Sequence, residues 1–198
     1  LWGFNYSRQD ISEEMKLPSI EIDSINLLNE LKLVENKLTK IRFLLDTNQL
    51  SIHCTNLDLL NIQNELYISF LANNLGKYHY SNFKILKPKG VLLHWSTSGV
   101  YFPFTGECNS DFGLHPIQEP FTIAHEFCHG TGWGDEATCN FLAWLALKDR
   151  QNLFYQYSVW FGYWKELLYY LKKNYYISYV SHTKLIPFEL LNDSQSIK

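Results

Sequence analysis

The sequence predicts an α+β fold that is mostly helical and includes a small β-sheet. Two observations carry this prediction: long segments in which apolar residues recur every three or four positions, and short runs rich in β-branched and aromatic residues. At 198 residues and 46% hydrophobic, the chain can bury a real core, so residues 1–198 are expected to form one domain. No internal repeat or low-complexity tract divides the chain.

Two helices are predicted in the first part of the chain. Residues 1–22 are polar and irregular, and we expect no long element there. Over residues 24–46, leucine, isoleucine and valine recur with helical spacing, which predicts a long amphipathic helix. A second helix is expected over 55–75, because Gly76 follows and favours a helix end.

The middle of the chain contains the predicted sheet. The run Lys-Pro-Lys-Gly at 87–90 is typical of a turn. Strands are expected at 91–95 and 100–102, where apolar and aromatic residues are concentrated. Residues 104–119 contain scattered glycine and proline and are predicted to form a loop.

Three further helices are predicted, at 120–130, at 136–149 and at about 152–173. Pro120 stands in the first turn of the first of them, where the missing N–H costs nothing. Aromatic residues are dense over 154–176. We expect most of these aromatic residues to pack in the core, with some tyrosines exposed. The alternatives are a surface that contacts a membrane or one that binds sugar or peptide.

Net charge and hydropathy limit which classes of partner the chain can bind. The net charge is −3 and no basic cluster is present, which argues against nucleic acid as a partner. No apolar stretch reaches the roughly eighteen residues that a membrane span requires. The sequence starts without an initiator methionine, and its first six residues, Leu-Trp-Gly-Phe-Asn-Tyr, suit the interfacial edge of a transmembrane helix. A trimmed or processed amino terminus explains them equally well.

The four cysteines are even in number but show no Cys-x-x-Cys spacing; they are Cys54, Cys108, Cys128 and Cys139. Because two of them lie in predicted helices, away from the positions that suit a metal ligand, we expect small buried packing residues. A disulfide framework is the less favoured alternative.

The run His-Glu-Phe-Cys-His, from His125 to His129, is the most informative functional pattern. On a helix, residues four apart lie on one face, so the two imidazoles can bind one cation. Glu126 lies beside the first histidine and can reach a metal-bound water without binding the metal. The pattern predicts a catalytic zinc site with an open position. A surface helix end with solvated side chains is disfavoured by the glycine-rich turn over 130–134 and the two acids beyond it.

Either of two adjacent acids, Asp135 and Glu136, can supply a third ligand. Asp135 would complete a metzincin-like pattern, but metzincins need a methionine turn downstream, and the only methionine is Met15. Asp135 also directly precedes an apolar-periodic run, which makes it a natural N-cap. We therefore favour Glu136 and keep Asp135 as the alternative. Asn140, on the same helix face as Glu136, either orients a ligand by a hydrogen bond or is a solvated polar residue.

A peptide-hydrolysing mechanism follows from such a site. Zinc would lower the pKa of a bound water and polarise the scissile carbonyl group. Glu126 would act as the general base and pass the proton to the leaving amine. Tyr157, His115 and Tyr101 are candidates for a further oxyanion donor, and spacing alone selects none of them.

Several segments resemble, in the same order, a bacterial family catalogued as domain of unknown function 3810. They are Trp-Gly-Phe-Asn-Tyr at 2–6, Gly-Val-Tyr-Phe-Pro-Phe-Thr-Gly-Glu-Cys-Asn at 99–109, Pro-Phe-Thr-Ile-Ala-His-Glu-Phe-Cys-His at 120–129, Glu-Ala-Thr-Cys-Asn-Phe-Leu-Ala at 136–143 and Tyr-Ser at 157–158. The resemblance covers residues 1 to about 170, and the block 99–143 is its most specific part.

This resemblance implies a zincin-like metallopeptidase domain with the small sheet beside the helix that carries the two histidines. It also implies the zinc ligands, which are His125, His129 and Glu136, and the catalytic base, which is Glu126. Two polar residues of the same family pattern are expected to line the cleft; they are Glu107 and Asn109.

The chain departs from the family pattern at four positions. Cysteine stands at 108, 128 and 139 where the family usually shows alanine, which agrees with small buried packing sites. Thr138 replaces a usual acid, and this removes a rival ligand.

The leading hypothesis is a zinc-dependent peptidase that acts on peptides or proteins near a membrane. The resemblance implies several membrane spans before Leu1, with the domain outside the cytoplasm. Two alternatives stay open, because a metal site does not by itself prove hydrolysis. One is a catalytically silent zinc-binding or sensing module, and the other is a zinc amidase that acts on cell-wall peptide.

Overall fold

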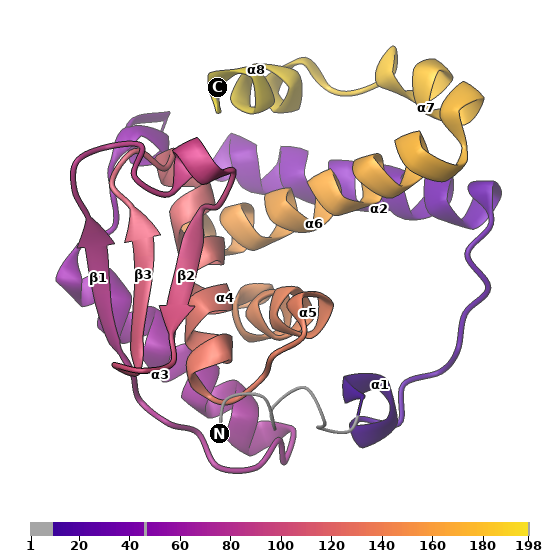
Figure 1. The fold of residues 1–198 in the computed structure, drawn as a ribbon. Coiled ribbons are helices and arrows are strands. Elements are labelled where there is room, and N and C mark those ends of the chain that lie inside the picture. Colours follow the sequence, from indigo (N-terminus) through magenta and orange to yellow (C-terminus); the bar gives the residue numbers. More distant parts are fainter. Residues whose placement is uncertain (1–9, 46, 198) are drawn as a thin grey trace.

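Helices make up most of the protein, and one small sheet lies beside them (Figure 1). The computed structural model describes residues 10–45 and 47–197. The helices are α1 (Ile11–Glu14), α2 (Ser24–Leu44), α3 (Asn56–Ala72), α4 (Glu119–Gly130), α5 (Glu136–Leu147), α6 (Leu153–Asn174), α7 (Tyr176–Thr183) and α8 (Phe188–Ser196). The strands are β1 (Asn82–Leu86), β2 (Gly99–Phe102) and β3 (Glu107–Asp111), and short 3-10 helices lie at Thr47–Ser51, Leu93–Trp95 and Pro116–Gln118. The predicted α+β fold class, mostly helical with a small sheet, is confirmed.

The long helices begin where the sequence provides side-chain caps. Asp23 accepts a hydrogen bond from the N–H of Asn26 at the start of α2, and Thr55 forms a capping box at the start of α3. Asp135 and Asn152 cap α5 and α6 in the same way. Within residues 10–45 and 47–197, no helix combines the length and the apolar character that crossing a membrane requires.

The sheet has the strand order β1-β3-β2, with β1 parallel and β2 antiparallel to the central β3. The sheet lies against α4, since Phe83 of β1 packs on Phe127 and the thiol of Cys108 in β3 donates a hydrogen bond to the carbonyl of Glu126. This order leaves β2 at the edge of the sheet, next to the middle of α4.

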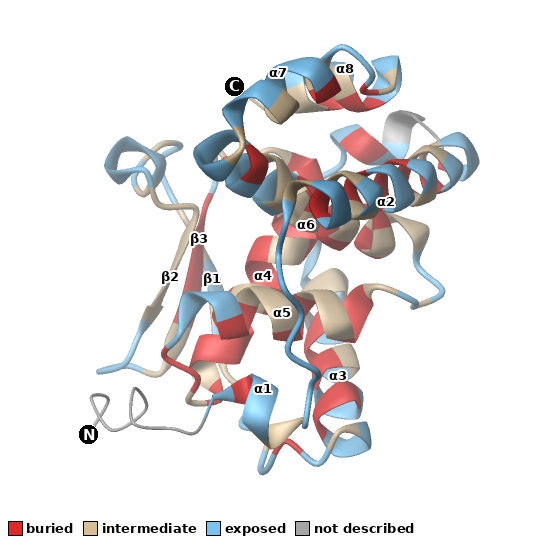
Figure 2. Ribbon diagram, turned by 90° about the vertical axis from the view of Figure 1, so that its right-hand side faces the viewer, coloured by how far each residue is buried: buried red, intermediate tan, exposed pale blue. Residues whose placement is uncertain are grey.

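Two clusters of buried apolar residues share α6. The first lies mainly among α3, α4 and α5, and the second lies among α2, α6 and α8 (Figure 2). Buried aromatic residues of α6 enter both clusters, whereas Tyr169 and Tyr176 are exposed, so the favoured interpretation of the aromatic segment is confirmed. All four cysteines are buried in the first cluster and none forms a disulfide, as expected of small packing residues.

One buried carboxylate fixes the loop before β2. Asp111 at the end of β3 accepts hydrogen bonds from the backbone N–H groups of four residues, which are Gly90, Leu92, Leu93 and Gly113. Burial alone would raise the pKa of Asp111, but these four bonds outweigh it and hold the pKa below its usual value. The loop that leads into β2 is therefore tied to the end of the central strand.

Asp111→Asn is expected to lower the free energy of unfolding by about 2 kcal/mol, because the amide nitrogen faces N–H groups that need an acceptor. The carboxylate stabilises the fold at pH values above its unfolded pKa, and this contribution is lost as the pH falls through the depressed folded pKa. The difference from wild type in urea unfolding should therefore be full at pH 7 and should shrink below about pH 4. Asp149→Asn, at an exposed ion pair, is the control. Equal midpoints for Asp111→Asn and wild type would refute this role.

The structure corrects several predicted elements. The strand expected at 91–95 is wrong: the segment contains a 3-10 helix, because its N–H groups bond to Asp111 rather than to a neighbouring strand. The loop expected over 104–119 contains β3, a polar strand that hydropathy alone did not indicate. The strand β1 and the short helices α1, α7 and α8 were also not predicted. The aromatic run at 1–6 lies outside the described residues.

Candidate metal centre

The helix α4 presents its two histidines to one point. His125 and His129 lie one turn apart, and their ring centroids are 4.7 Å apart. The helix ends at Gly130, as the glycine-rich turn predicted, and Gly132 adopts a φ of 96° that favours glycine. This tight turn brings the start of α5 back toward the histidines.

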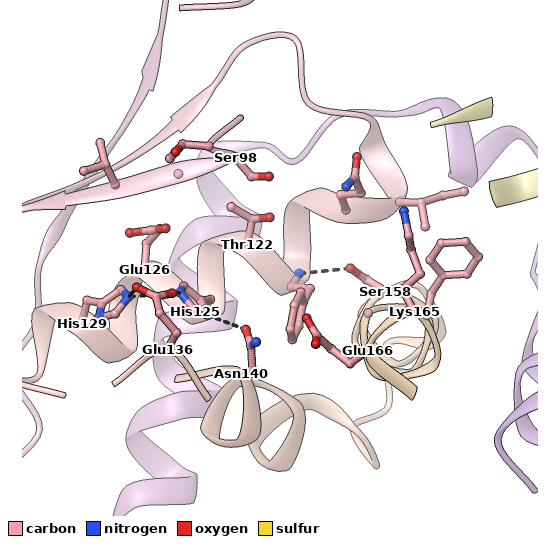
Figure 3. A pocket seen from close by; sticks show the side chains of 18 of the residues that line it. Ser98, Thr122, His125, Glu126, His129, Glu136, Asn140, Ser158, Lys165 and Glu166 are labelled. Atoms are coloured by element: carbon pink, nitrogen blue, oxygen red, sulfur yellow. Dashed lines mark hydrogen bonds and ion pairs between the residues drawn. The ribbon is translucent and has the colours of Figure 1, made fainter. Parts of the chain in front are cut away.

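Glu136, the first residue of α5, completes a cluster of three potential ligands (Figure 3). Its carboxylate oxygens lie 3.0 Å from Nε2 of His125 and 3.4 Å from Nε2 of His129. The two Nε2 atoms are 3.0 Å apart. One atom from each residue therefore faces a common centre, and the other side of Glu136 is open to solvent.

Hydrogen bonds on the far sides of the rings orient both histidines. Nδ1 of His125 lies 2.7 Å from Oδ1 of Asn140, and Nδ1 of His129 lies 2.8 Å from the carbonyl oxygen of Trp133. Because a carbonyl oxygen accepts, each Nδ1 carries a proton, and in the neutral ring each Nε2 then presents a lone pair to the centre. Two lone pairs and a carboxylate thus converge, and such a set of acceptors needs a cation.

The distances fit a zinc ion. Zinc–nitrogen bonds of about 2.05 Å in tetrahedral geometry separate neighbouring ligand atoms by about 3.3 Å. The two Nε2 atoms are 3.0 Å apart, and the Glu136 carboxylate approaches them at 3.0 and 3.4 Å through its two different oxygens, so each separation is close to this value. Two imidazole nitrogens and one carboxylate oxygen are also donors that zinc accepts readily, whereas calcium and magnesium prefer oxygen alone.

The pKa values of the three side chains also indicate that the cluster favours a positive charge. Burial opposes protonation of His125, but its hydrogen bond with Glu136 and the negative charges of Glu126 and Glu136 outweigh burial and raise its pKa. Burial and the neighbouring His125 lower the pKa of His129. The hydrogen bond from His125 lowers the pKa of Glu136. One positive charge is therefore favoured among the three side chains, and a bound cation can take its place.

Glu126 lies beside this cluster without joining it. Its side chain is buried, and Oε2 has no hydrogen-bond partner among the described residues. Burial raises the pKa of Glu126 to about 7, against the opposing charge of His125. An unpartnered buried carboxylate oxygen next to three convergent acceptors suits a group that exchanges a proton with a ligand in the cavity.

The cluster opens into a cavity of about 620 Å³. Five elements line it: the edge strand β2 with the loop before it, the 3-10 helix at Pro116–Gln118, the helix α4, the first turns of α5, and one face of α6. Besides the cluster itself, the polar lining residues include Ser98, Thr122, Asn140 and Ser158 (Figure 3). The candidate metal centre is therefore accessible from a cleft large enough for several residues of a peptide.

The adjacent acids Asp135 and Glu136 have different roles in the structure. Asp135 caps α5 through a 2.7 Å hydrogen bond from the N–H of Thr138, which confirms the predicted cap. Its carboxylate is not part of the convergent cluster, whereas that of Glu136 is. Asn140 also reaches the site and bonds to His125, which is the first of the two roles left open by the sequence.

Several other candidates are not brought to the site. Tyr157 is fully buried and donates a hydrogen bond to Asp193 in the second core, because its side chain faces away from the cavity on α6. His115 caps the short helix at Pro116–Gln118. Glu107 pairs with Lys84, and Asn109 bonds to main-chain carbonyls within the sheet, so neither lines the cavity. These four placements correct the expectations from the sequence.

Tyr101, a candidate from the sequence, lies in the cavity wall on β2. Gly99, on the same strand, also lines the cavity, and the sequence did not identify it as a site residue. A Cβ atom at position 99 would lie only 2.5 to 2.8 Å from three atoms of the Glu126 side chain. The glycine thus leaves the room that the Glu126 carboxylate occupies. Gly99 directly precedes the strand predicted at 100–102 and is the first residue of β2 in the structure; a glycine within a strand often marks a close backbone approach, but only the fold identifies what approaches.

Comparison with known proteins identifies one relationship. The family described as "Protein of unknown function (DUF3810)" matches residues 1–198. Neither the curated proteins nor the solved structures give a match.

Proposed function

The chain belongs to this family of unknown function, and we propose that its cleft is the active site of a zinc-dependent metallopeptidase with a zincin-like domain. One observation carries the proposal: His125, His129 and Glu136 converge on one point beside the buried, unpartnered carboxylate of Glu126. Three protein ligands with a cavity on the open side are the arrangement of a catalytic zinc site rather than a closed structural one.

The residues of the chain divide the catalytic work. Bound zinc supplies a Lewis acid that lowers the pKa of water and polarises a carbonyl group. Asn140 and the carbonyl of Trp133 hold the two imidazoles in the required tautomer and orientation. Glu126 accepts a proton at Oε2 and delivers it to the leaving amine, since this oxygen has no other partner in the described part of the chain.

The edge strand supports a peptide as the substrate. Ser98, Gly99, Val100 and Tyr101 are consecutive, yet all four line the cavity. Because side chains alternate along a strand, this pattern means that the edge of β2 itself faces the cleft. An extended peptide can add to such an edge through main-chain hydrogen bonds, which hold it across the metal centre.

The experiment measures zinc content and cleavage of a peptide library by the purified protein. The proposal predicts about one zinc per chain and cleavage that a chelator abolishes and added zinc restores. Stoichiometric zinc without cleavage of any peptide would favour the silent binding or sensing module. Cleavage confined to cell-wall peptides would favour the amidase, and a protein that binds no zinc would refute the proposal.

Gly99→Ala is expected to lower kcat about a hundredfold without loss of zinc. The added methyl group would overlap the Glu126 side chain, and a shift of about 1 Å in a catalytic group can cost a factor of this size. The measurement is the rate of peptide cleavage together with metal analysis. Phe102→Ala, on the same strand but outside the cavity lining, is the control. Unchanged kcat in Gly99→Ala would show that Glu126 does not need its present position.

A further inference from the structure

One face of α6 forms the end of the cleft away from the metal ligands (Figure 3). The residues of α6 that line the cavity follow helical spacing, and they are Ser158, Phe161, Gly162, Lys165 and Glu166. Two contacts fix this face against α4. The hydroxyl of Ser158 accepts a 3.0 Å hydrogen bond from the N–H of Phe121, and the Phe121 ring lies so close to Gly162 that a Cβ there would be 2.9 Å from it.

Lys165 lies in the middle of this face. At about 100° per residue, it is rotated by roughly 20° from Ser158, which points directly at α4. Glu166 is rotated by about 80° and therefore lies at the edge of the face. Lys165 is also about 10 Å further along α6 than Ser158, where the wall of the cavity continues beyond the contact with α4.

The charges in the cleft are few. Apart from the metal centre, Lys165 and Glu166 are the charged residues among the described residues that line the cavity. Among the described residues, no hydrogen bond or ion pair to the ammonium group of Lys165 is found. The surface between it and the metal centre is mixed, with the Phe121 ring beside the polar side chains of Asn140 and Ser158. An ammonium group without an ion-pair partner at the end of a cleft can attract an anionic group of a ligand.

The distance of Lys165 from the metal centre determines how far from the scissile bond the anionic group of a substrate would lie. Phe121 lies one turn before His125, about 6 Å along α4, and Lys165 lies about 4.5 Å along α6 beyond Gly162, which touches Phe121. Because the two helices cross, these steps do not add along one line, but both are short, and they place Lys165 on the order of 10 Å from the metal centre, which an extended peptide spans in about three residues.

We propose that Lys165 determines substrate specificity by binding a carboxylate two or three residues from the scissile bond. The inference rests on the proposed peptidase function and adds a substrate class to it, namely peptides with an acidic group at that distance. The carboxylate comes from an acidic side chain or from the carboxyl terminus of a short peptide. Because Lys165 is exposed, the attraction is partly screened, and we expect a preference of about tenfold.

The test uses peptide hydroxamates, which bind zinc, and measures their dissociation constants for the zinc-loaded protein. One pair carries glutamate or glutamine at the second or third residue, and another pair has a free or an amidated carboxyl terminus. The acidic member of at least one pair should bind about tenfold more tightly at low ionic strength, and added salt should reduce the difference. The pair that shows the preference identifies the source of the carboxylate.

Variants of the lysine complete the design. Lys165→Met should abolish the preference, Lys165→Arg should keep it, and Lys165→Glu should reverse it. Lys173→Met, on the last turn of the same helix and outside the cavity, should bind like wild type. Hydroxamates that bind without any preference, or a preference that survives Lys165→Met, would overturn the role of Lys165 while leaving the zinc site intact. A protein that holds no zinc and binds none of them would overturn the proposed function and this inference with it.

Discussion

Glu126→Gln is expected to lower kcat for peptide cleavage about a thousandfold while the protein keeps its zinc. The glutamine side chain has nearly the same shape, but its amide cannot accept a proton from water. Glu126 is not one of the three convergent ligand residues, so the affinity for the metal should change little. The measurement is steady-state cleavage together with zinc content and thermal unfolding.

Glu107→Gln is the matched control for this variant. Glu107 lies in β3, pairs with Lys84 and does not line the cavity, so the substitution should leave both kcat and zinc content at wild-type values. Undiminished cleavage by Glu126→Gln would remove the general base from the mechanism. Loss of zinc from Glu126→Gln would instead place Glu126 among the ligands.

Glu136→Ala is expected to weaken zinc binding by more than about a hundredfold, because removal of a ligand costs more than the ten- to hundredfold loss typical of its supporting hydrogen bonds. Its carboxylate lies 3.0 and 3.4 Å from the two Nε2 atoms, and no other acid of the described residues joins the cluster. The measurement is competition for zinc with a chelator of known affinity.

Asp135→Ala separates the two neighbouring acids. Loss of the cap of α5 should lower the free energy of unfolding by about 1 kcal/mol, and zinc affinity should stay close to that of wild type. If Glu136→Ala kept its zinc and Asp135→Ala lost it, the third ligand would be Asp135 and the account of the centre would be incorrect.

The core of the candidate site could be predicted because it is local in the sequence. His125, Glu126 and His129 lie on one helix, where spacing alone determines which side chains share a face. The choice between Asp135 and Glu136 also depended on local chemistry, since a cap residue binds the backbone of its own helix. The cap and the convergence of Glu136 with the histidines agree with that reasoning.

Features that depend on distant segments could not be predicted in this way. Gly99 matters because a strand passes over Glu126, and Lys165 matters because α6 crosses α4 at Ser158. Neither of these two contacts between distant segments produces a recognisable sequence pattern around Gly99 or Lys165. The polar strand β3 was missed for the same reason, since its side chains are satisfied by hydrogen bonds to segments elsewhere.

Tyr157 and Ser158 are adjacent on α6, yet they have different surroundings because their side chains point in different directions. The adjacent pair Tyr157 and Ser158 belongs to the segments that resemble the family, yet the two side chains differ in direction by about 100°. Ser158 bonds to the start of α4 and lines the cavity, whereas Tyr157 bonds to Asp193 and helps to join α6 to α8. Only the direction of the α4–α6 contact distinguishes the two.

The central claim is that His125, His129 and Glu136 hold a zinc ion in this cleft. The most direct test is anomalous diffraction, at the zinc absorption edge, from crystals of the zinc-loaded protein. The account predicts a single strong peak at about 2.0 to 2.2 Å from Nε2 of both histidines and from a carboxylate oxygen of Glu136. No peak at this position, or a peak bound by Asp135 in place of Glu136, would contradict it.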